Sequence, residues 1–156
     1  MTDMTYSESD ITNLLINYHA ERESIAKTIS QLHHQAADLF YPGGSSDDIR
    51  VQTEFSQGQL IDAMLRRCDE SREYQRRTLE DIKHMSDTLD RLMFHVNRLP
   101  GKLKLVVIDT FVNGEAVKHF AERTGQARET VSRDRQHAVG IVVHCMNSHR
   151  IRVDHA

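Results

Sequence analysis

The chain of 156 residues contains no tryptophan, only 2 prolines and only 7 glycines. Aromatic residues make up 6% of it, and the 2 cysteines, Cys68 and Cys145, lie far apart in the sequence. β-Sandwiches and barrels usually need more turn-forming residues, and two isolated cysteines fit a reducing compartment rather than a disulfide framework. The composition therefore predicts an all-α protein whose helices pack mainly through Leu, Ile, Val and Met.

Long hydrophobic runs are also absent. No stretch approaches the roughly 20 apolar residues that cross a membrane. The first residues carry Asp3, Glu8 and Asp10 instead of a basic start followed by an apolar run, so they do not resemble a signal peptide. We expect a cytoplasmic protein that makes no contact with a membrane.

Signatures of catalysis are lacking as well. The sequence has no glycine loop that cradles phosphate and no nucleophile elbow. Three carboxylates of the basic part of the chain show no nuclease motif, and four late histidine and cysteine residues have spacings that give no compact tetrahedral metal site. The carboxylates are Asp109, Glu115 and Glu122, and the other four are His137, His144, Cys145 and His149. We expect no enzyme activity, no cofactor and no metal.

Charge is divided unevenly along the chain. Residues 1–97 hold 10 Lys and Arg against 17 Asp and Glu, a balance of −7, whereas residues 98–156 hold 10 against 6, a balance of +4. Five of the 10 histidines also lie in the second part. A basic part joined to an acidic part indicates that one end of the protein meets a polyanion.

Two apolar stripes at helical spacing occupy residues 1–98. One predicts a helix over 7–40, with Ser7 and Asp10 at capping-box spacing, and the other a helix over 59–98. Polar residues interrupt the stripes at Arg22, Arg72, Gln75 and Ser86. Residues 42–48 form a breaker run, a stretch of Pro, Gly, Ser and Asp that interrupts regular structure. This run predicts a loop over 41–58, with a short extended segment in 49–55. We expect an antiparallel helical hairpin that serves oligomerisation or partner binding, with a homo-oligomer built through its apolar faces.

Leu99 and Pro100 end the second stripe and mark the predicted domain boundary, so residues 99–156 form a second domain. Three helices are predicted there, over 101–112, 115–124 and about 127–146, with a turn at Asn113 and Gly114. The first presents Leu103, Val106, Val107 and Phe111 inward, and the second presents Val117, Phe120 and Ala121.

Ala121, Gly125 and Val131 have the spacing of a helix-turn-helix core. A small residue is needed where two helices cross closely, a glycine permits positive φ at the turn, and a β-branched residue anchors the next helix. The third helix then presents polar residues suited to a major groove. The expected contacts to DNA bases are Arg128, Glu129, Ser132, Arg133 and Gln136, and the expected phosphate contacts are Lys102, Lys104, Lys118, Arg123 and Arg135.

The stretch 99–138 resembles region four of bacterial sigma-seventy factors. The resemblance rests on the Leu-Pro start, the Phe-Val-Asn-Gly run at 111–114, the Ala121 and Gly125 pair, and Arg-Glu-Thr-Val at 128–131. It implies a recognition helix that reads promoter DNA, with Arg128, Glu129 and Arg133 as leading base contacts. Most of the chain, with the N-terminal hairpin and its loop from Tyr41 to Asp47, resembles phage and prophage regulators of the RinA and ArpU types. This resemblance implies activation of late genes with host RNA polymerase.

Four positions depart from the sigma pattern. Thr124 and Gln126 stand where apolar residues are common, and Ala127 replaces the usual serine cap. Asp134 stands where an apolar residue usually faces the core. Because a buried unpaired carboxylate is costly, we expect either that Arg123 or Arg135 pairs with Asp134 or that the helix is rotated.

Three functions fit these observations. The first is a sequence-specific transcription regulator that binds double-stranded DNA and contacts bacterial RNA polymerase. The second is a phage packaging protein like a small terminase subunit, for which ring assembly would be the sign. The third is a protein-interaction module that binds polymerase or another regulator without touching DNA, for which binding would survive removal of the charges at Arg128 and Arg133.

Overall fold

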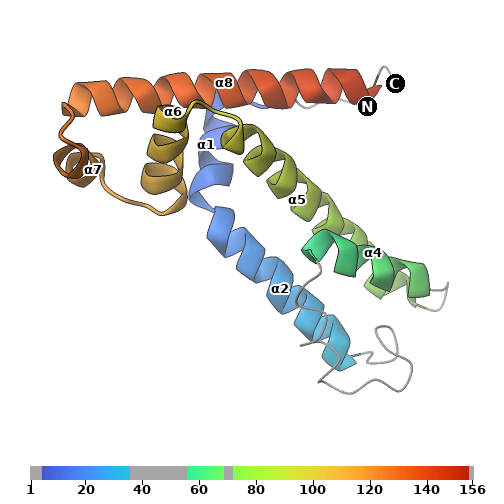
Figure 1. Cartoon of the computed structure of the whole chain (residues 1–156). Helices are drawn as coiled ribbons and strands as arrows, with labels where there is room; N and C mark the ends of the chain where they lie inside the picture. The colour runs from blue at the N-terminus through green and yellow to red at the C-terminus, as the bar shows by residue number, and fades with distance from the viewer. Residues whose placement is uncertain (1–4, 36–55, 69–71, 155–156) are drawn as a thin grey trace. The chain divides into compact units, whose positions relative to one another are not determined.

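The structure, a computed structural model, describes residues 5–35, 56–68 and 72–154, and describes side chains as far as Ser148. Helices dominate these residues and no strand occurs among them, so the predicted all-α class is confirmed (Figure 1). In chain order the helices are α1 (Glu8–Ile16), α2 (Tyr18–Gln35), α4 (Gln57–Arg67), α5 (Glu73–Asn97), α6 (Gly101–Val107), the π-helix η4 (Ile108–Val112), α7 (Val117–Thr124) and α8 (Arg128–Asp154).

The single helix predicted from residue 7 onward is wrong, because it is broken at Asn17. The predicted capping box is present: the Asp10 amide donates to Ser7 Oγ at 3.1 Å, and the Ser7 amide donates to Asp10 Oδ2 at 2.9 Å. Asn17 then leaves the helical conformation, with φ −92° and ψ 6°. Asparagine is common where a helix ends, because its side-chain amide competes with the helix for backbone hydrogen bonds. The apolar stripe continues through the break, so its periodicity did not reveal it.

The helix predicted over 59–98 is likewise two helices, α4 and α5. Helix α4 begins at Gln57, where Ser56 and Gln59 form a capping box with two amide hydrogen bonds of 3.1 Å. It ends at Arg67, and the capping residue Cys68 that follows has an extended backbone, with φ −79° and ψ 121°. The predicted loop over 41–58 therefore ends earlier, at Ser56. Its breaker run and the predicted extended segment in 49–55 lie outside the described residues.

The contacts between residues divide the chain into two compact units. Unit 1 comprises residues 1–19 and 89–156, and unit 2 comprises residues 20–88. This division does not coincide with the boundary predicted at Leu99, nor does it keep residues 1–98 together as one hairpin domain. The physical reason is the packing of α1, whose Ile11 and Leu15 are fully buried in a core with residues from the C-terminal third of the chain.

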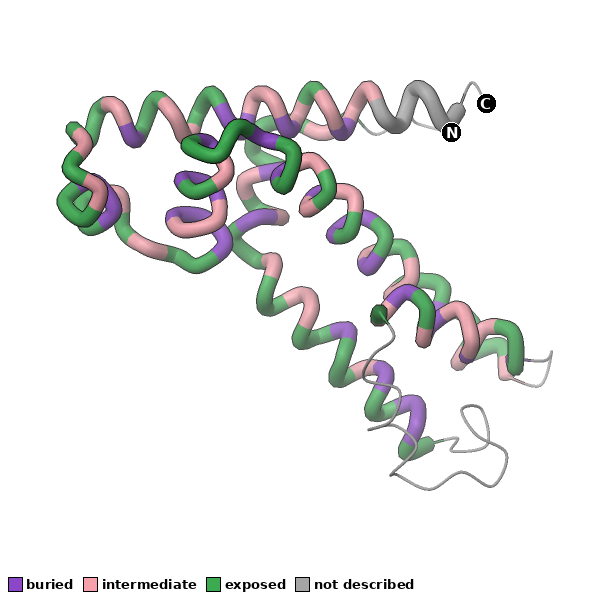
Figure 2. Tube along the Cα trace, viewed as in Figure 1, coloured by how far each residue is buried: buried purple, intermediate pink, exposed green. Residues whose placement is uncertain are grey.

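The core of unit 1 lies where α1, α6 and η4 meet α8 (Figure 1). Val106 lies outside this core, but the other three residues predicted to point inward from 101–112 belong to it. Buried and exposed residues follow one another around α8 (Figure 2), as expected for a helix with one buried face. The buried members are Ile11, Leu15, Leu92, Val96, Leu99, Leu103, Val107, Phe111, Val112, Ala138, Val139, Val142 and Met146.

Unit 2 contains most of α2, all of α4 and most of α5, and a polar contact joins the three helices. Arg22 Nη1 donates to Gln57 Oε1 at 3.2 Å and to Ser86 Oγ at 3.3 Å, while Gln57 Nε2 donates to the Arg22 carbonyl at 3.0 Å. Ser86 is fully buried. Two of the polar residues that interrupt the predicted apolar stripes, Arg22 and Ser86, are therefore hydrogen-bond partners.

Candidate nucleic-acid interface

A tight turn joins α7 to α8. Gly125 ends α7 in the left-handed region, with φ 72° and ψ 25°, and the Gln126 amide donates back to the Ala121 carbonyl at 2.9 Å. This closure satisfies a carbonyl at the end of the helix and needs a residue that tolerates positive φ. The sequence named Gly125 for this conformation, and the structure places it there.

A small apolar cluster holds the two helices around that turn. Ala121 of α7 and Val131 of α8 are buried together with Phe120 and with Val106 of α6, and Val117 packs against them from the side. Ala121 and Val131 are the residues that the spacing selected as core positions. Because Val131 is fully buried, the start of α8 is fixed in rotation, and this decides which of its side chains face solvent.

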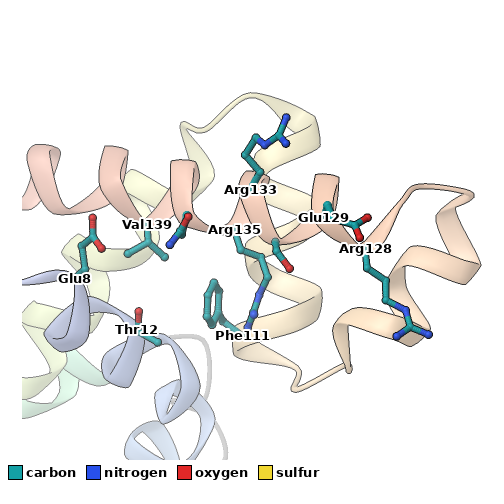
Figure 3. A pocket seen from close by; sticks show the side chains of 10 residues that line it. Glu8, Thr12, Phe111, Arg128, Glu129, Arg133, Arg135 and Val139 are labelled. Carbon is teal, nitrogen blue, oxygen red and sulfur yellow. The ribbon is translucent and has the colours of Figure 1, made fainter.

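The five predicted base contacts share one exposed face of α8. Their positions fall at helical spacing within its first nine residues, and each of the five is exposed. They also line one open groove of about 730 Å³ within unit 1, on α8 (Figure 3). The remaining lining residues are Arg135 and Val139 of α8, Phe111 of η4, and Glu8 and Thr12 of α1.

Glu8 and Thr12 were not identified from the sequence as site residues. They lie one turn apart on α1, more than 100 positions before the α8 residues with which they share the groove. No local motif marks them, because their place depends on how Ile11 and Leu15 bury α1 in the core of unit 1. Only the packing of the chain brings them to the site.

Three of the five cations predicted to contact phosphate are engaged by other side chains. Lys102 Nζ lies 3.3 Å from Asp134 Oδ2. Arg123 Nη2 lies 2.7 Å from Asp109 Oδ2 and 3.1 Å from Glu115 Oε1. These bonds raise the pKa of Arg123. The hydrogen bond to Glu115 contributes most to the rise, and the hydrogen bond to Asp109 contributes next.

Arg135 is the third engaged cation. Its Nε donates to Thr110 Oγ1 at 3.0 Å, and its guanidinium carbon lies 4.0 Å from the centre of the Phe111 ring. Burial lowers the pKa of Arg135, yet an arginine so shifted keeps its charge at neutral pH. The remaining two candidates, Lys104 and Lys118, are half-buried and exposed respectively.

The partner predicted for Asp134 was wrong. The sequence suggested Arg123 or Arg135, but Lys102 of α6 forms the ion pair. Arg123 lies on α7 and is held by Asp109 and Glu115, while Arg135 is turned towards η4. Asp134 keeps only 17% of its side-chain surface exposed, so its pairing offsets part of the cost of burial.

Two of the four positions that depart from the sigma pattern, Thr124 and Ala127, are accommodated locally, whereas Gln126 Oε1 is buried without a hydrogen-bond partner among the described residues. Thr124 Oγ1 donates to the Phe120 carbonyl at 2.8 Å, which keeps its hydroxyl satisfied within α7. Gln126 is half-buried at the turn, and Ala127 accepts the first helical hydrogen bond from the Val131 amide at 3.1 Å.

Within the described residues, no three His, Cys, Asp or Glu side chains are grouped in a way that could hold a metal ion. The same residues include no helix that is long and apolar enough to span a membrane. Comparison of the chain with models of known protein families, with curated proteins and with solved structures gives no match.

Proposed function

We propose that the protein is a sequence-specific regulator of transcription that binds double-stranded DNA through the start of α8. The observation that carries this proposal is the exposed face of α8, which gathers two arginines, a glutamate, a serine and a glutamine along one open groove. The face follows directly on a glycine turn between two helices packed through Ala121 and Val131. This is the arrangement by which a helix-turn-helix presents its second helix to the major groove.

The side chains of that face match the chemistry of base edges. Arg128 and Arg133 each offer two donors in a plane, which fit the O6 and N7 acceptors of guanine. Glu129 accepts from the amino group of cytosine, and Gln136 bonds the N6 and N7 atoms of adenine. Ser132, between the two arginines, donates or accepts with either kind of base edge.

The regulatory part of the proposal rests on the resemblance of residues 99–138 to sigma region four. On that basis the protein activates phage or prophage late genes together with bacterial RNA polymerase. The polymerase would be contacted through the sigma-like surface or through the acidic part of the chain, where residues 1–97 carry a charge balance of −7. The oligomer proposed through the apolar faces of the first 98 residues would present two such reading helices to one DNA site.

A selection from a randomised duplex library tests the proposal. The wild type is compared with Arg128→Ala/Arg133→Ala and with a control, Lys27→Ala/Arg77→Ala. The control removes the same charge from two exposed i,i+4 ion pairs in unit 2, which contribute little to stability. The wild type and the control should enrich one short sequence that the groove variant does not enrich. Enrichment of no sequence by the wild type would refute DNA reading.

A second function, a protein-interaction module, is favoured by one observation. Lys102, Arg123 and Arg135 are engaged by neighbouring side chains of the same protein, which leaves fewer cations for phosphate. Binding to purified RNA polymerase distinguishes the two functions. If Arg128→Ala/Arg133→Ala binds polymerase as the wild type does, and neither protein binds duplex DNA, the module hypothesis stands.

A further inference from the structure

The groove beside α8 has a wall that belongs to a different part of the chain. Glu8 and Thr12 of α1 line it together with the five proposed base contacts, all within unit 1 (Figure 3). Helix α1 is held firmly there, because its Ile11 and Leu15 side chains are fully buried in the core of unit 1. Anything that fills the groove beside α8 therefore meets the side chains of α1.

The segment before α1 is fixed to α8 by a reciprocal pair of hydrogen bonds. The Tyr6 amide donates to Asn147 Oδ1 at 2.8 Å, and Asn147 Nδ2 donates to the Tyr6 carbonyl at 3.1 Å. The capping box of Ser7 and Asp10 then starts the helix. Glu8 is the first residue after that cap, so its backbone position is set by bonds on both sides.

The charges on the two walls of the groove are opposite in sign. The α8 wall carries Arg128, Arg133 and Arg135 against one carboxylate, Glu129, whereas Glu8 is the charged residue of the α1 wall. A carboxylate at this place is repelled by phosphate, and the DNA backbone offers it no hydrogen-bond donor. The base edges of a major groove do offer donors, namely the amino groups of cytosine and adenine.

We infer that Glu8 is a specificity-determining residue of the DNA site, an acidic reading group that α1 delivers to the groove beside α8. This inference rests on the proposed function and deepens it. Binding to non-cognate DNA depends almost wholly on phosphate, so the Glu8 carboxylate weakens it. In the cognate complex the same carboxylate accepts a hydrogen bond from a base amino group, which offsets the repulsion. Specificity then arises from repulsion as well as from attraction.

The test compares two duplexes, the sequence enriched by the wild type and a shuffled version of it. Glu8→Gln should bind the shuffled duplex about two- to fivefold more tightly at low salt, because one repulsive charge is removed. The ratio of the two affinities should fall by about fivefold or more. Glu80→Gln is the matched control, since it removes the same charge from an exposed position of α5 in unit 2 and should leave both affinities unchanged.

A second variant tests the same wall in the opposite direction. Thr12→Asp adds a carboxylate one turn along α1 and should weaken binding to the shuffled duplex by about two- to fivefold. If Glu8→Gln and Glu80→Gln behave alike on both duplexes while the wild type still prefers its enriched sequence, the role of Glu8 is overturned and the proposed function stands. If the wild type binds the two duplexes equally, the proposed function fails and the role of Glu8 fails with it.

Discussion

Lys102 of α6 lies 3.3 Å from Asp134 of α8, at Asp134 Oδ2. The pair joins the helix that begins after Pro100 to the helix proposed to read DNA. It also holds a cation that the sequence assigned to phosphate. The Asp134 carboxylate should therefore compete with a DNA phosphate for the Lys102 ammonium.

Removing the charge of Asp134 should strengthen binding to duplex DNA. The Lys102 side chain is already 57% exposed. In Asp134→Asn its ammonium becomes available to a phosphate, so the affinity rises and the slope of log affinity against log salt steepens by about 0.9. The double variant Lys102→Met/Asp134→Asn should show no such gain. Fluorescence anisotropy at several salt concentrations measures both quantities, and equal slopes for the wild type and Asp134→Asn would contradict this account.

Two glycines of unit 1 should respond oppositely to alanine. At both Gly125 and Gly140 an added Cβ meets no atom within 4 Å, but only Gly125 has positive φ, at 72°. Gly125→Ala should therefore lower the free energy of unfolding by about 1 kcal/mol. Gly140→Ala, inside α8, should raise it by about 0.5 to 1 kcal/mol because alanine favours a helix interior. Urea unfolding followed by circular dichroism measures both, and equal effects at the two sites would rule out a strained turn.

Arg135 should contribute more to the stability of the fold than Arg133 does. Its guanidinium bonds Thr110 Oγ1 and stacks on Phe111, so it fixes α8 against η4. Arg135→Met should lower the free energy of unfolding by roughly 1 kcal/mol, and Arg135→Lys should recover little of it, since lysine has neither the planar fork nor the stacking face. Arg133→Met, at an exposed position, should change stability by less than about 0.5 kcal/mol. Thermal melts of the three variants provide the comparison, and equal losses at 133 and 135 would refute it.

The stability of unit 2 should depend on pH in the alkaline range through Lys83. Burial by itself lowers the pKa of Lys83, but its bonds to Asp62 at 3.1 Å and Asp87 at 3.2 Å outweigh that effect and raise it above the ordinary 10.5. A raised pKa stabilises the fold fully at pH values below the unfolded pKa, and the stabilisation disappears as pH rises through the folded pKa.

The comparison of wild type with Lys83→Met isolates this contribution. The difference in their free energies of unfolding should be constant from pH 7 to about pH 9 and should shrink above about pH 10. Chemical unfolding across this range measures it. If the difference between the two free energies of unfolding grew with pH, the folded protein would destabilise the charged form of Lys83, which would contradict the raised pKa.

Local patterns predicted the elements near the site better than they predicted the partners of those elements. The Ser7 and Asp10 box, the glycine turn at 125 and the burial of Ala121 and Val131 all follow from spacing and backbone chemistry. The apolar stripe of the first helix was visible as well. What it did not show is that Ile11 belongs to unit 1 and Ile25 to unit 2.

Apart from the local helix break at Asn17, the misses share a physical cause, which is that they depend on contacts between residues far apart in the chain. The acidic wall residue Glu8 reaches the groove only because α1 packs against α8. Asp134 is paired by Lys102, 32 positions away, instead of by an arginine nearby. Ser86 and Arg22 interrupt separate stripes, yet they are bonded to each other. Periodicity reports which face of a helix is buried and says nothing about what buries it.

The most direct test of DNA reading is the ratio of dissociation constants for the enriched duplex and its shuffled version, measured at one salt concentration. For a specific regulator the wild type should bind the enriched duplex at least about 10³-fold more tightly. Arg128→Ala/Arg133→Ala should reduce that ratio by about 10²-fold or more, since each bidentate arginine contributes roughly 1–3 kcal/mol of discrimination. A wild-type ratio near one, or a ratio that the double variant leaves unchanged, would contradict the claim that α8 reads DNA.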